Sequence, residues 1–350
     1  MVANKIDKAP IALIMAGGSG TRFWPMSSKD LPKQYLPLTS SHSLIQETVQ
    51  RLKPLCISDR IFIASEKSQF KLLKQQLPEI HNLILEPVAK NTAACLMLSV
   101  STLLKQGFST DSPLMVFPAD HTIGNPPVFL TALQQALSFV QTREALLTFG
   151  IPPTSPHTGY GYIECAESVQ HGICGVKRFT EKPTRPTAEG FLRAGNYFWN
   201  SGIFVWTLRS IVTAFESFLS ASWNAIHNAK SESELVECFK QLPAQPIDTA
   251  VLEKSSKVFV LPVPHLEWND LGSWKALYEF KAVHPQENVC LSGELKELES
   301  EGCLIKVRPD TQVALVGVKN LVVVQEGNRL LILDKEQDQK VKEISQQIER

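Results

Sequence analysis

The stretch LIMAGGSGTRFWPMSSKDLPKQYLPL, from Leu13 to Leu38, decides how the rest of the chain is interpreted. An apolar run that ends at Ala16 is followed by three glycines within four residues. Glycines lack a Cβ, so backbone N–H groups can come close to a phosphate and form an anion-binding nest. Arg22 and Lys33 follow and supply positive charge. The spacing therefore indicates a phosphate-binding loop, although a tight turn with surface cations would fit the same letters.

Two other glycine-rich loops fit this stretch poorly. A dinucleotide-binding loop reads GxGxxG, and Gly18 and Gly20 match it, but Phe23 occupies the position of the third glycine. A Walker loop reads GxxxxGK[ST], and Pro25 stands where the second glycine would follow Gly20. The sequence thus disfavours a nicotinamide-dependent dehydrogenase and a P-loop nucleotide hydrolase.

Composition limits the classes of partner. The chain has 350 residues, 43% of them hydrophobic, which is enough for one large domain or two unequal ones. Its 35 Lys+Arg balance 35 Asp+Glu, whereas a sequence-independent grip on nucleic acid needs a basic excess. The first ten residues are polar, unlike a signal peptide, and no run reaches the ~18 apolar residues of a membrane helix. We therefore expect a cytoplasmic protein that binds neither nucleic acid nor a membrane.

The seven cysteines are scattered singly along the chain. None forms a CxxC pair, which disfavours a zinc site. The count is odd, and a chain of this length does not need disulfides to fold, so reduced thiols are expected.

Short apolar runs alternate with helix-period segments over the first half of the chain. The runs are IALIMA, RIFIAS, NLILEP, PLMVFPAD and ALLTFGI, and the segments between them include LIQETVQRL and NTAACLMLSVSTLLKQ. This alternation predicts an α/β fold with a Rossmann-like, mostly parallel mixed sheet flanked by helices. Ligands of such sheets lie at the carboxyl ends of the strands. The loops GGSGTR, EPVAKNT and FPADH are therefore expected to line one ligand-binding site at that edge of the sheet.

The pattern changes toward the C-terminus. From about His284 the chain consists of short β-branched pieces such as CLIKV and NLVVVQEG, and it closes with a polar helical segment, KEQDQKVKEISQQIE. We place a boundary near residue 283, with a main domain over 1–283 and a small β-rich module, for which a β-helix is one arrangement, over 284–350. No catalytic motif falls beyond Trp274. We expect the module to pack on the main domain or on a second subunit rather than to bind substrate. A homodimer is one of the assemblies that this expectation allows.

The glycine loop resembles the signature of sugar-1-phosphate nucleotidylyltransferases, and FWPMS with PKQ is similar to the mannose-1-phosphate guanylyltransferase branch. Seven further stretches match in the order of the family: EPVAKNTAA, FPADH, FGIPPTSPHTGYGYI, RFTEKPT, YFWNSGIF, PIDTAVLEK and WNDLGSW. Together they run from Leu13 to Trp274. The chain lacks the isomerase domain of the long, bifunctional relatives and so resembles the short, monofunctional form.

The resemblance implies an enzyme that transfers GMP from GTP to α-D-mannose 1-phosphate, giving GDP-mannose and pyrophosphate. In this reaction a sugar-phosphate oxygen makes an in-line attack on the α-phosphorus, and Mg²⁺ assists the attack. No protein nucleophile or covalent intermediate is needed. Another hexose or heptose 1-phosphate is an alternative substrate. A non-catalytic regulator that binds nucleotide sugar is the competing class. Such a regulator typically loses a charged catalytic residue, and here all five remain: Arg22, Lys33, Asp120, Lys182 and Asp270.

The resemblance also assigns roles to individual residues. Asp120 and Asp270 match the Mg²⁺ ligands, and carboxylate oxygens suit this hard cation, although each aspartate would also suit a helix cap. Arg22 and Lys33 match the cations on the triphosphate. His121, beside Asp120, is expected to pack rather than to bind a metal.

For the sugar, the resemblance places Lys182 on the phosphate, Glu181 and Asn200 on the hydroxyl groups, and the backbone of Gly161 beside the ring. Alternation along a strand would send Glu181 and Lys182 to opposite faces unless the strand ends before Pro183.

For the nucleotide, the resemblance implies close backbone approach at four positions of the glycine loop and base recognition in the EPVAKNT loop. A carboxylate at Glu86 could accept from guanine N1–H and N2–H₂, while Asn91 would equally suit a helix N-cap. The expected nucleotide-binding residues are Ala16, Gly17, Gly18, Gly20, Glu86, Asn91 and Thr92.

Overall fold

The computed structural model describes residues 9–18 and 20–348 and divides into two compact units. Unit 1 holds the chain up to Gly17 together with Thr48–Ala119 and Ile123–Trp268, and unit 2 holds Gly18–Glu47, Asp120–Thr122 and the chain from Asn269 onward. Ser19 of the glycine loop lies outside the described residues. Both units are discontinuous in sequence, and the boundary near residue 283 stays a prediction.

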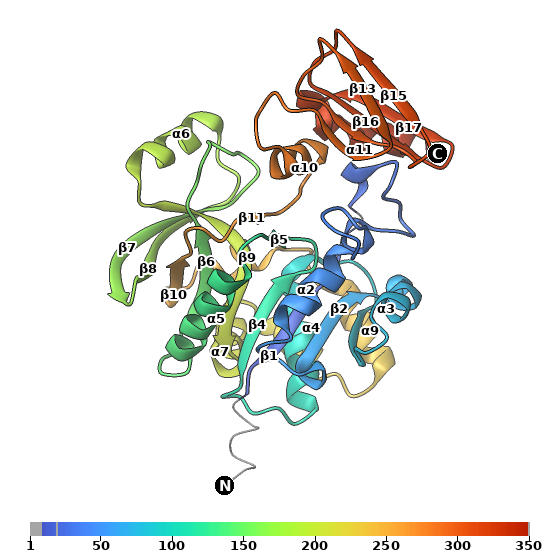
Figure 1. The fold of residues 1–350 in the computed structure, drawn as a ribbon. Coiled ribbons are helices and arrows are strands. Elements are labelled where there is room, and N and C mark those ends of the chain that lie inside the picture. The colour runs from blue at the N-terminus through green and yellow to red at the C-terminus, as the bar shows by residue number, and fades with distance from the viewer. Residues whose placement is uncertain (1–8, 19, 349–350) are drawn as a thin grey trace. The chain divides into compact units, whose positions relative to one another are not determined.

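Unit 1 is built, within the described residues, on a nine-stranded sheet of order β3-β2-β1-β4-β9-β6-β10-β8-β7 (Figure 1). Strands β3, β2, β1 and β4 run parallel, and β9 is inserted antiparallel between β4 and β6. The expected α/β fold with parallel strands flanked by helices is confirmed. The strands are β1 (Ile11–Met15), β2 (Ile61–Glu66), β3 (Asn82–Glu86), β4 (Pro113–Pro118), β6 (Leu146–Ile151), β7 (Tyr162–Gln170), β8 (Ile173–Thr180), β9 (Tyr197–Thr207) and β10 (Val258–Pro262).

Three helices of unit 1, α5, α7 and α9, begin at residues whose side chains cap the helix. The Asn125 side chain accepts a hydrogen bond from the Val128 N–H at the start of α5, and Thr207 accepts from Ser210 at the start of α7. No helix of the described residues is long and apolar enough to cross a membrane. The helices are α3 (Phe70–Gln76), α4 (Asn91–Lys105), α5 (Pro126–Val140), α6 (Arg185–Ala194), α7 (Leu208–Phe218), α8 (Ser220–His227) and α9 (Glu232–Gln241), with two short 3₁₀ helices, η3 (Ser58–Arg60) and η4 (Lys67–Gln69), and one π-helix, η5 (Asp248–Leu252).

Three elements lie where the chain passes from one unit to the other. Helix α2 (Leu44–Leu52) begins at a reciprocal cap in which Ser43 N–H donates to Gln46 Oε1 at 2.9 Å and Gln46 N–H donates to Ser43 Oγ at 3.4 Å. The other two are the short strands β5 (Thr122–Ile123) and β11 (Trp268–Asn269).

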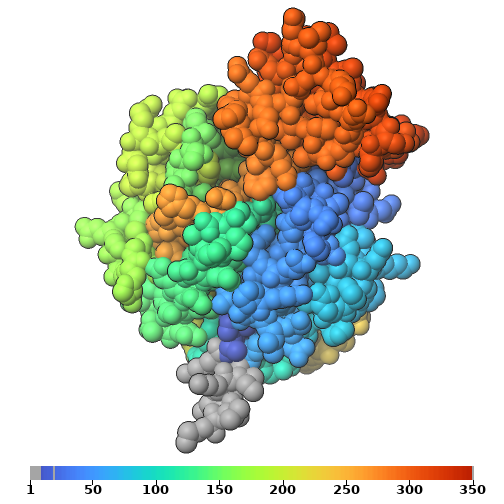
Figure 2. Space-filling view, viewed as in Figure 1, coloured from blue at the N-terminus to red at the C-terminus, as the bar shows by residue number. Residues whose placement is uncertain are grey.

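The C-terminal part of unit 2 is a stack of short strands that forms one continuous orange-to-red mass in Figure 2. Parallel partners such as Glu294 and Gln312 are 18 residues apart, so each coil of chain lies on the previous one. The expected β-rich module is confirmed. Its strands are β12 (Val289–Ser292), β13 (Glu294–Leu298), β14 (Leu304–Lys306), β15 (Gln312–Val316), β16 (Leu321–Glu326) and β17 (Arg329–Asp334).

One apolar core joins this stack to the glycine loop within unit 2. Phe23 and Trp24 of the loop are buried together with Trp274, Leu304 and Val341. The Trp274 indole Nε1 donates to the Trp24 carbonyl at 3.1 Å, and the Phe23 and Trp274 ring centroids lie 4.8 Å apart. The remaining elements of unit 2 are η1 (Thr21–Phe23), η2 (Lys33–Tyr35) and α10 (Trp274–Lys281).

The polar C-terminal segment is not the single helix that the sequence suggests. It forms a 3₁₀ turn, η6 (Lys335–Lys340), followed by helix α11 (Val341–Ile348). The Asp334 side chain accepts from the Glu336 N–H and begins the first of the two elements.

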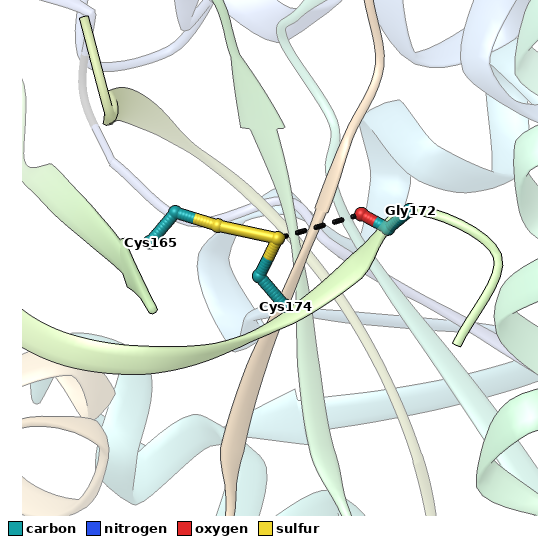
Figure 3. The surroundings of a disulfide bond; sticks show 3 residues. All are labelled: Cys165, Gly172 and Cys174. Atoms are coloured by element: carbon teal, nitrogen blue, oxygen red, sulfur yellow. Dashed lines mark hydrogen bonds between the residues drawn. A yellow bond between two sulfur atoms is a disulfide. The ribbon is translucent and has the colours of Figure 1, made fainter. Parts of the chain in front are cut away.

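The expectation that all cysteines are reduced is wrong for one pair. Cys165 on β7 and Cys174 on β8 form a disulfide, with Cα atoms 5.8 Å apart, and Cys174 Sγ also contacts the Gly172 carbonyl (Figure 3). The two strands are antiparallel neighbours, so pairing of the chain brings together cysteines that the sequence shows only as single residues. The other cysteines are free: Cys56, Cys95, Cys238, Cys290 and Cys303.

The shared core predicts how substitutions in the module change stability. Leu304 is fully buried, so Leu304→Ala should lower the free energy of unfolding by about 2–5 kcal/mol through lost burial and a cavity. Leu298 is 62% exposed in the same module, and Leu298→Ala should change it by less than about 0.5 kcal/mol. Chemical denaturation of both variants measures the difference, and equal destabilisation would contradict a structural core at Leu304.

Candidate active site

The glycine loop follows β1 and turns directly against Lys33. Gly20 has a left-handed φ of 55°, and a Cβ placed on it would lie 2.7 Å from the Lys33 backbone nitrogen. A side chain at this position would therefore force the loop away from Lys33. The absence of a Cβ, which indicated phosphate binding in the sequence, also allows this close packing within unit 2.

Lys33 ties together three segments that are far apart in sequence. Its side chain is 7% exposed, and its Nζ donates to Asp120 Oδ2 at 2.8 Å and to the Asp270 carbonyl at 2.5 Å. The Nζ also lies 5.9 Å from the centroid of the Phe23 ring. The expected triphosphate cation and the two expected Mg²⁺ ligands are thus brought together in unit 2.

The two aspartates differ in their surroundings. Burial acts to raise the pKa of Asp120, but Lys33 and His121 outweigh it and hold that pKa below its usual value. Asp270 Oδ1 accepts from the Gly272 N–H at 3.2 Å, and the cap of the following helix α10 is Ser273 rather than Asp270. The helix-cap alternative for Asp270 is therefore wrong.

The donor set fits a hard divalent cation. Carboxylates are available at Asp120, whose side chain is 35% exposed, and at Asp270. No cluster of three or more His, Cys, Asp or Glu side chains suited to a metal occurs in residues 9–18 and 20–348. Mg²⁺ commonly takes one or two carboxylates and completes its shell with phosphate oxygens and water. The chain thus offers the ligands for such a substrate-shared site.

A cavity of about 270 Å³ opens beside these groups within unit 2. The Arg22 guanidinium lines it and donates to the Gly272 carbonyl at 3.1 Å. Lys342 of α11, in the module where the sequence shows no catalytic motif, lines it as well. The complete lining is Gly20, Thr21, Arg22, Phe23, Lys33, Asp120, Gly272 and Lys342.

The residues expected to hold the sugar phosphate gather in unit 1. Strand β8 ends at Thr180, and Lys182 adopts a positive φ of 45°, so the chain turns and the Lys182 and Glu181 side chains lie 3.2 Å apart. The strand ends before Glu181 and Lys182, so the alternation of side chains along a strand does not send the two to opposite faces. A Cβ on Gly161 would lie 2.6 Å from Glu181 Oε2, so the Gly161 backbone lies directly beside this carboxylate.

Asn200 belongs to the same group and is held on several sides. Its backbone N–H donates to the Gly161 carbonyl at 2.8 Å, its Oδ1 accepts from Thr148, and its Nδ2 donates to Asp248 Oδ1 at 2.8 Å. These contacts fix which way the amide faces. Burial and the neighbouring Glu181 carboxylate raise the pKa of Asp248 to about 6.

Three residues of these two sites, Thr148, Asp248 and Lys342, are not indicated by the sequence motifs. Asp248 lies within PIDTAVLEK, a stretch already recognised, so that motif could have pointed to it. Thr148 lies in an apolar strand and Lys342 in a polar helix, and neither position carried a signal.

The expected base-recognition residues lie at the end of β3 and the start of α4, also in unit 1. Glu86 is 5% exposed, and burial and the like charge of Glu66 raise its pKa to about 7. Asn91 Oδ1 accepts from the Thr92 N–H at 2.7 Å, and Thr92 Oγ1 accepts from the Ile247 N–H at 2.8 Å. Thr92 thereby holds the segment that leads into Asp248.

Comparisons with known proteins identify the family of the chain. The sequence pattern of the nucleotidyl transferase family matches residues 11–287, and that of the MannoseP isomerase/GMP-like beta-helix domain matches residues 293–348. The mannose-1-phosphate guanylyltransferases of Klebsiella pneumoniae and Escherichia coli are each 38% identical over 348 residues, which cover 95% of this chain and 72% of theirs.

Solved structures give the same result for the fold. The crystal structure of mannose-1-phosphate geranyltransferase from Thermus thermophilus is 32% identical in sequence, with a TM-score of 0.89 over 98% of this chain and 100% of that one. The chain therefore belongs to the mannose-1-phosphate guanylyltransferase family of nucleotidyl transferases.

Proposed function

We propose that this chain transfers GMP from GTP to α-D-mannose 1-phosphate and releases GDP-mannose and pyrophosphate. The observation that carries the proposal is the convergence of Arg22, Lys33, Asp120 and Asp270 in one unit, beside a glycine loop. Such a set can grip a triphosphate and a divalent cation. We take mannose as the sugar and guanine as the base because the relatives are named mannose-1-phosphate guanylyltransferases.

The proposed chemistry is one in-line displacement. A phosphate oxygen of the sugar 1-phosphate forms a bond to the α-phosphorus, while the bond from that phosphorus to the bridging β-phosphate oxygen breaks and pyrophosphate leaves. Arg22 and Lys33 offset the negative charge that develops on the leaving group. Mg²⁺ held by Asp120 and Asp270 would supply further positive charge on the phosphate oxygens.

On the sugar side, the residues of unit 1 bind and orient. Lys182 is the cation for the sugar phosphate. Asn200 has one amide hydrogen committed to Asp248, and its Oδ1 accepts from Thr148 and from the Gly202 N–H, so its second amide hydrogen is left to donate to a sugar hydroxyl in a fixed orientation. Fixing the amide beforehand reduces the entropy lost when the sugar binds.

The direct test follows pyrophosphate release from purified protein given GTP, Mg²⁺ and a panel of sugar 1-phosphates. We expect release that requires both substrates, is greatest with mannose 1-phosphate, stops with a chelator and returns with excess Mg²⁺. Preference for a different hexose or heptose 1-phosphate would replace the proposed sugar and keep the reaction. No release with any pair, together with measurable binding of a nucleotide sugar, would instead support a regulatory homologue.

A matched pair of variants separates the metal ligand from a general charge effect. Asp270→Asn should lower kcat by at least ~10²-fold, the scale of losing one preorganised electrostatic contact. Asp310→Asn, at a side chain that is 77% exposed in the same unit, should leave kcat unchanged. Near-normal turnover of Asp270→Asn would refute the proposed ligand.

The base preference yields a pH-dependent prediction. A Glu86 carboxylate can accept from guanine N1–H, whereas it would face the N1 acceptor of adenine, so GTP should be favoured over ATP by at least ~10²-fold in kcat/KM. Because its pKa is raised to about 7, Glu86 is protonated below that pH and accepts poorly there. The GTP:ATP ratio should therefore rise between about pH 6 and pH 8.

ATP serves as the internal control, since both nucleotides carry the same titrating phosphates. Glu86→Gln should reduce the GTP:ATP ratio and remove its pH dependence, while Mg²⁺ dependence persists. An unchanged ratio in this variant would mean that another group recognises the base.

A further inference from the structure

Lys342 is a charged side chain of the C-terminal module that lines the same cavity as the glycine-loop cations. The sequence gives no reason to expect it there, because Lys342 lies about 310 residues from Lys33 in a polar segment. Both residues belong to unit 2.

Apolar packing fixes where this lysine lies. Its neighbour Val341 is 2% exposed and belongs to the core that contains Phe23 and Trp24. Ser345, one turn later on α11, is also buried, and its hydroxyl donates to the Lys342 carbonyl at 2.9 Å. Helix α11 is thus anchored beside the glycine loop through its buried face, while the Lys342 side chain is exposed.

The charges in the cavity are unevenly matched. Lys33 is paired with Asp120, the one carboxylate in the lining. Arg22 contacts only a backbone carbonyl among its described hydrogen-bond partners, and Lys342 forms no ion pair with a carboxylate of residues 9–18 and 20–348. The cavity therefore has two cations without a matching carboxylate, which favours a ligand with more than one negative charge.

We propose that Lys342 binds a diphosphate group, namely the β,γ-phosphates of the nucleotide before the reaction and pyrophosphate after it. This inference rests on the proposed function, and it adds a binding residue from the β-stack module to those of the glycine loop. The chemistry is non-covalent. An ammonium group donates to phosphate oxygens, and charge-assisted hydrogen bonds of this kind are stronger than neutral ones.

The test measures binding of inorganic pyrophosphate to the full-length protein by isothermal titration calorimetry in the presence of Mg²⁺. Lys342→Ala should weaken pyrophosphate binding about tenfold, and Lys342→Arg should restore most of it. Lys340→Ala, at an exposed lysine outside the cavity lining, should bind like wild type. All variants should keep the wild-type thermal midpoint, because both lysines are exposed.

Steady-state kinetics and binding of a nucleotide without the diphosphate show which part of the substrates Lys342 contacts. Lys342→Ala should raise the KM for GTP about tenfold and leave the KM for the sugar 1-phosphate unchanged. Binding of GMP, which lacks the diphosphate, should be the same in Lys342→Ala and wild type. A loss confined to pyrophosphate would assign Lys342 to product alone and overturn the substrate half of the proposal.

Two outcomes overturn the inference in distinguishable ways. If wild type binds pyrophosphate and Lys342→Ala binds it equally well, Lys342 has no such role and the nucleotidyl-transfer proposal stands. If wild type binds neither pyrophosphate nor GTP, the phosphate site itself is wrong, and both proposals fail together.

Discussion

The ammonium group of Lys33 is the contact on which the proposed phosphate site depends. It is nearly buried, and its partners come from residues 87 and 237 positions away in sequence, the Asp120 carboxylate and the Asp270 carbonyl. A buried charge that loses its partner carries an uncompensated desolvation cost, so each of the three segments constrains the other two. Gly20 permits the arrangement because no Cβ separates the loop from Lys33. The same contact that orders unit 2 thereby places the Lys33 ammonium group and the Asp120 carboxylate side by side in the lining of the cavity.

The second constraint is the apolar core that the glycine loop shares with the C-terminal β-stack. Phe23 and Trp24 are buried with Trp274 and with strand residues of the module, so the loop is supported by chain that follows it by about 250 residues. Sequence order suggests a catalytic domain with an appended module. The compact unit that carries the glycine loop also contains the module, and Lys342 lies at the edge of that shared core.

Much of this could be predicted from the sequence because the signals are local. Apolar runs such as the one that ends at Ala16 predict the strands, helix-period segments predict helices such as α4, and the family resemblance points to the aspartates and Lys33. What could not be predicted depends on long-range pairing. The Cys165–Cys174 disulfide requires the antiparallel contact of β7 and β8. Likewise, Asp248 is linked to the proposed sugar site only through its hydrogen bond with Asn200, and no local sequence pattern predicts that contact.

The central claim is that these residues position and neutralise two phosphorylated substrates while the protein itself forms no bond to phosphorus. The stereochemistry at the α-phosphorus tests this claim most directly. The enzyme would be given one diastereomer of guanosine 5′-O-(1-thiotriphosphate) with mannose 1-phosphate, and the configuration of the thio-sugar nucleotide product would be determined by ³¹P NMR. A single in-line displacement predicts inversion at phosphorus. Net retention would reveal two successive displacements through a covalent nucleotidyl-enzyme and would contradict the proposed mechanism.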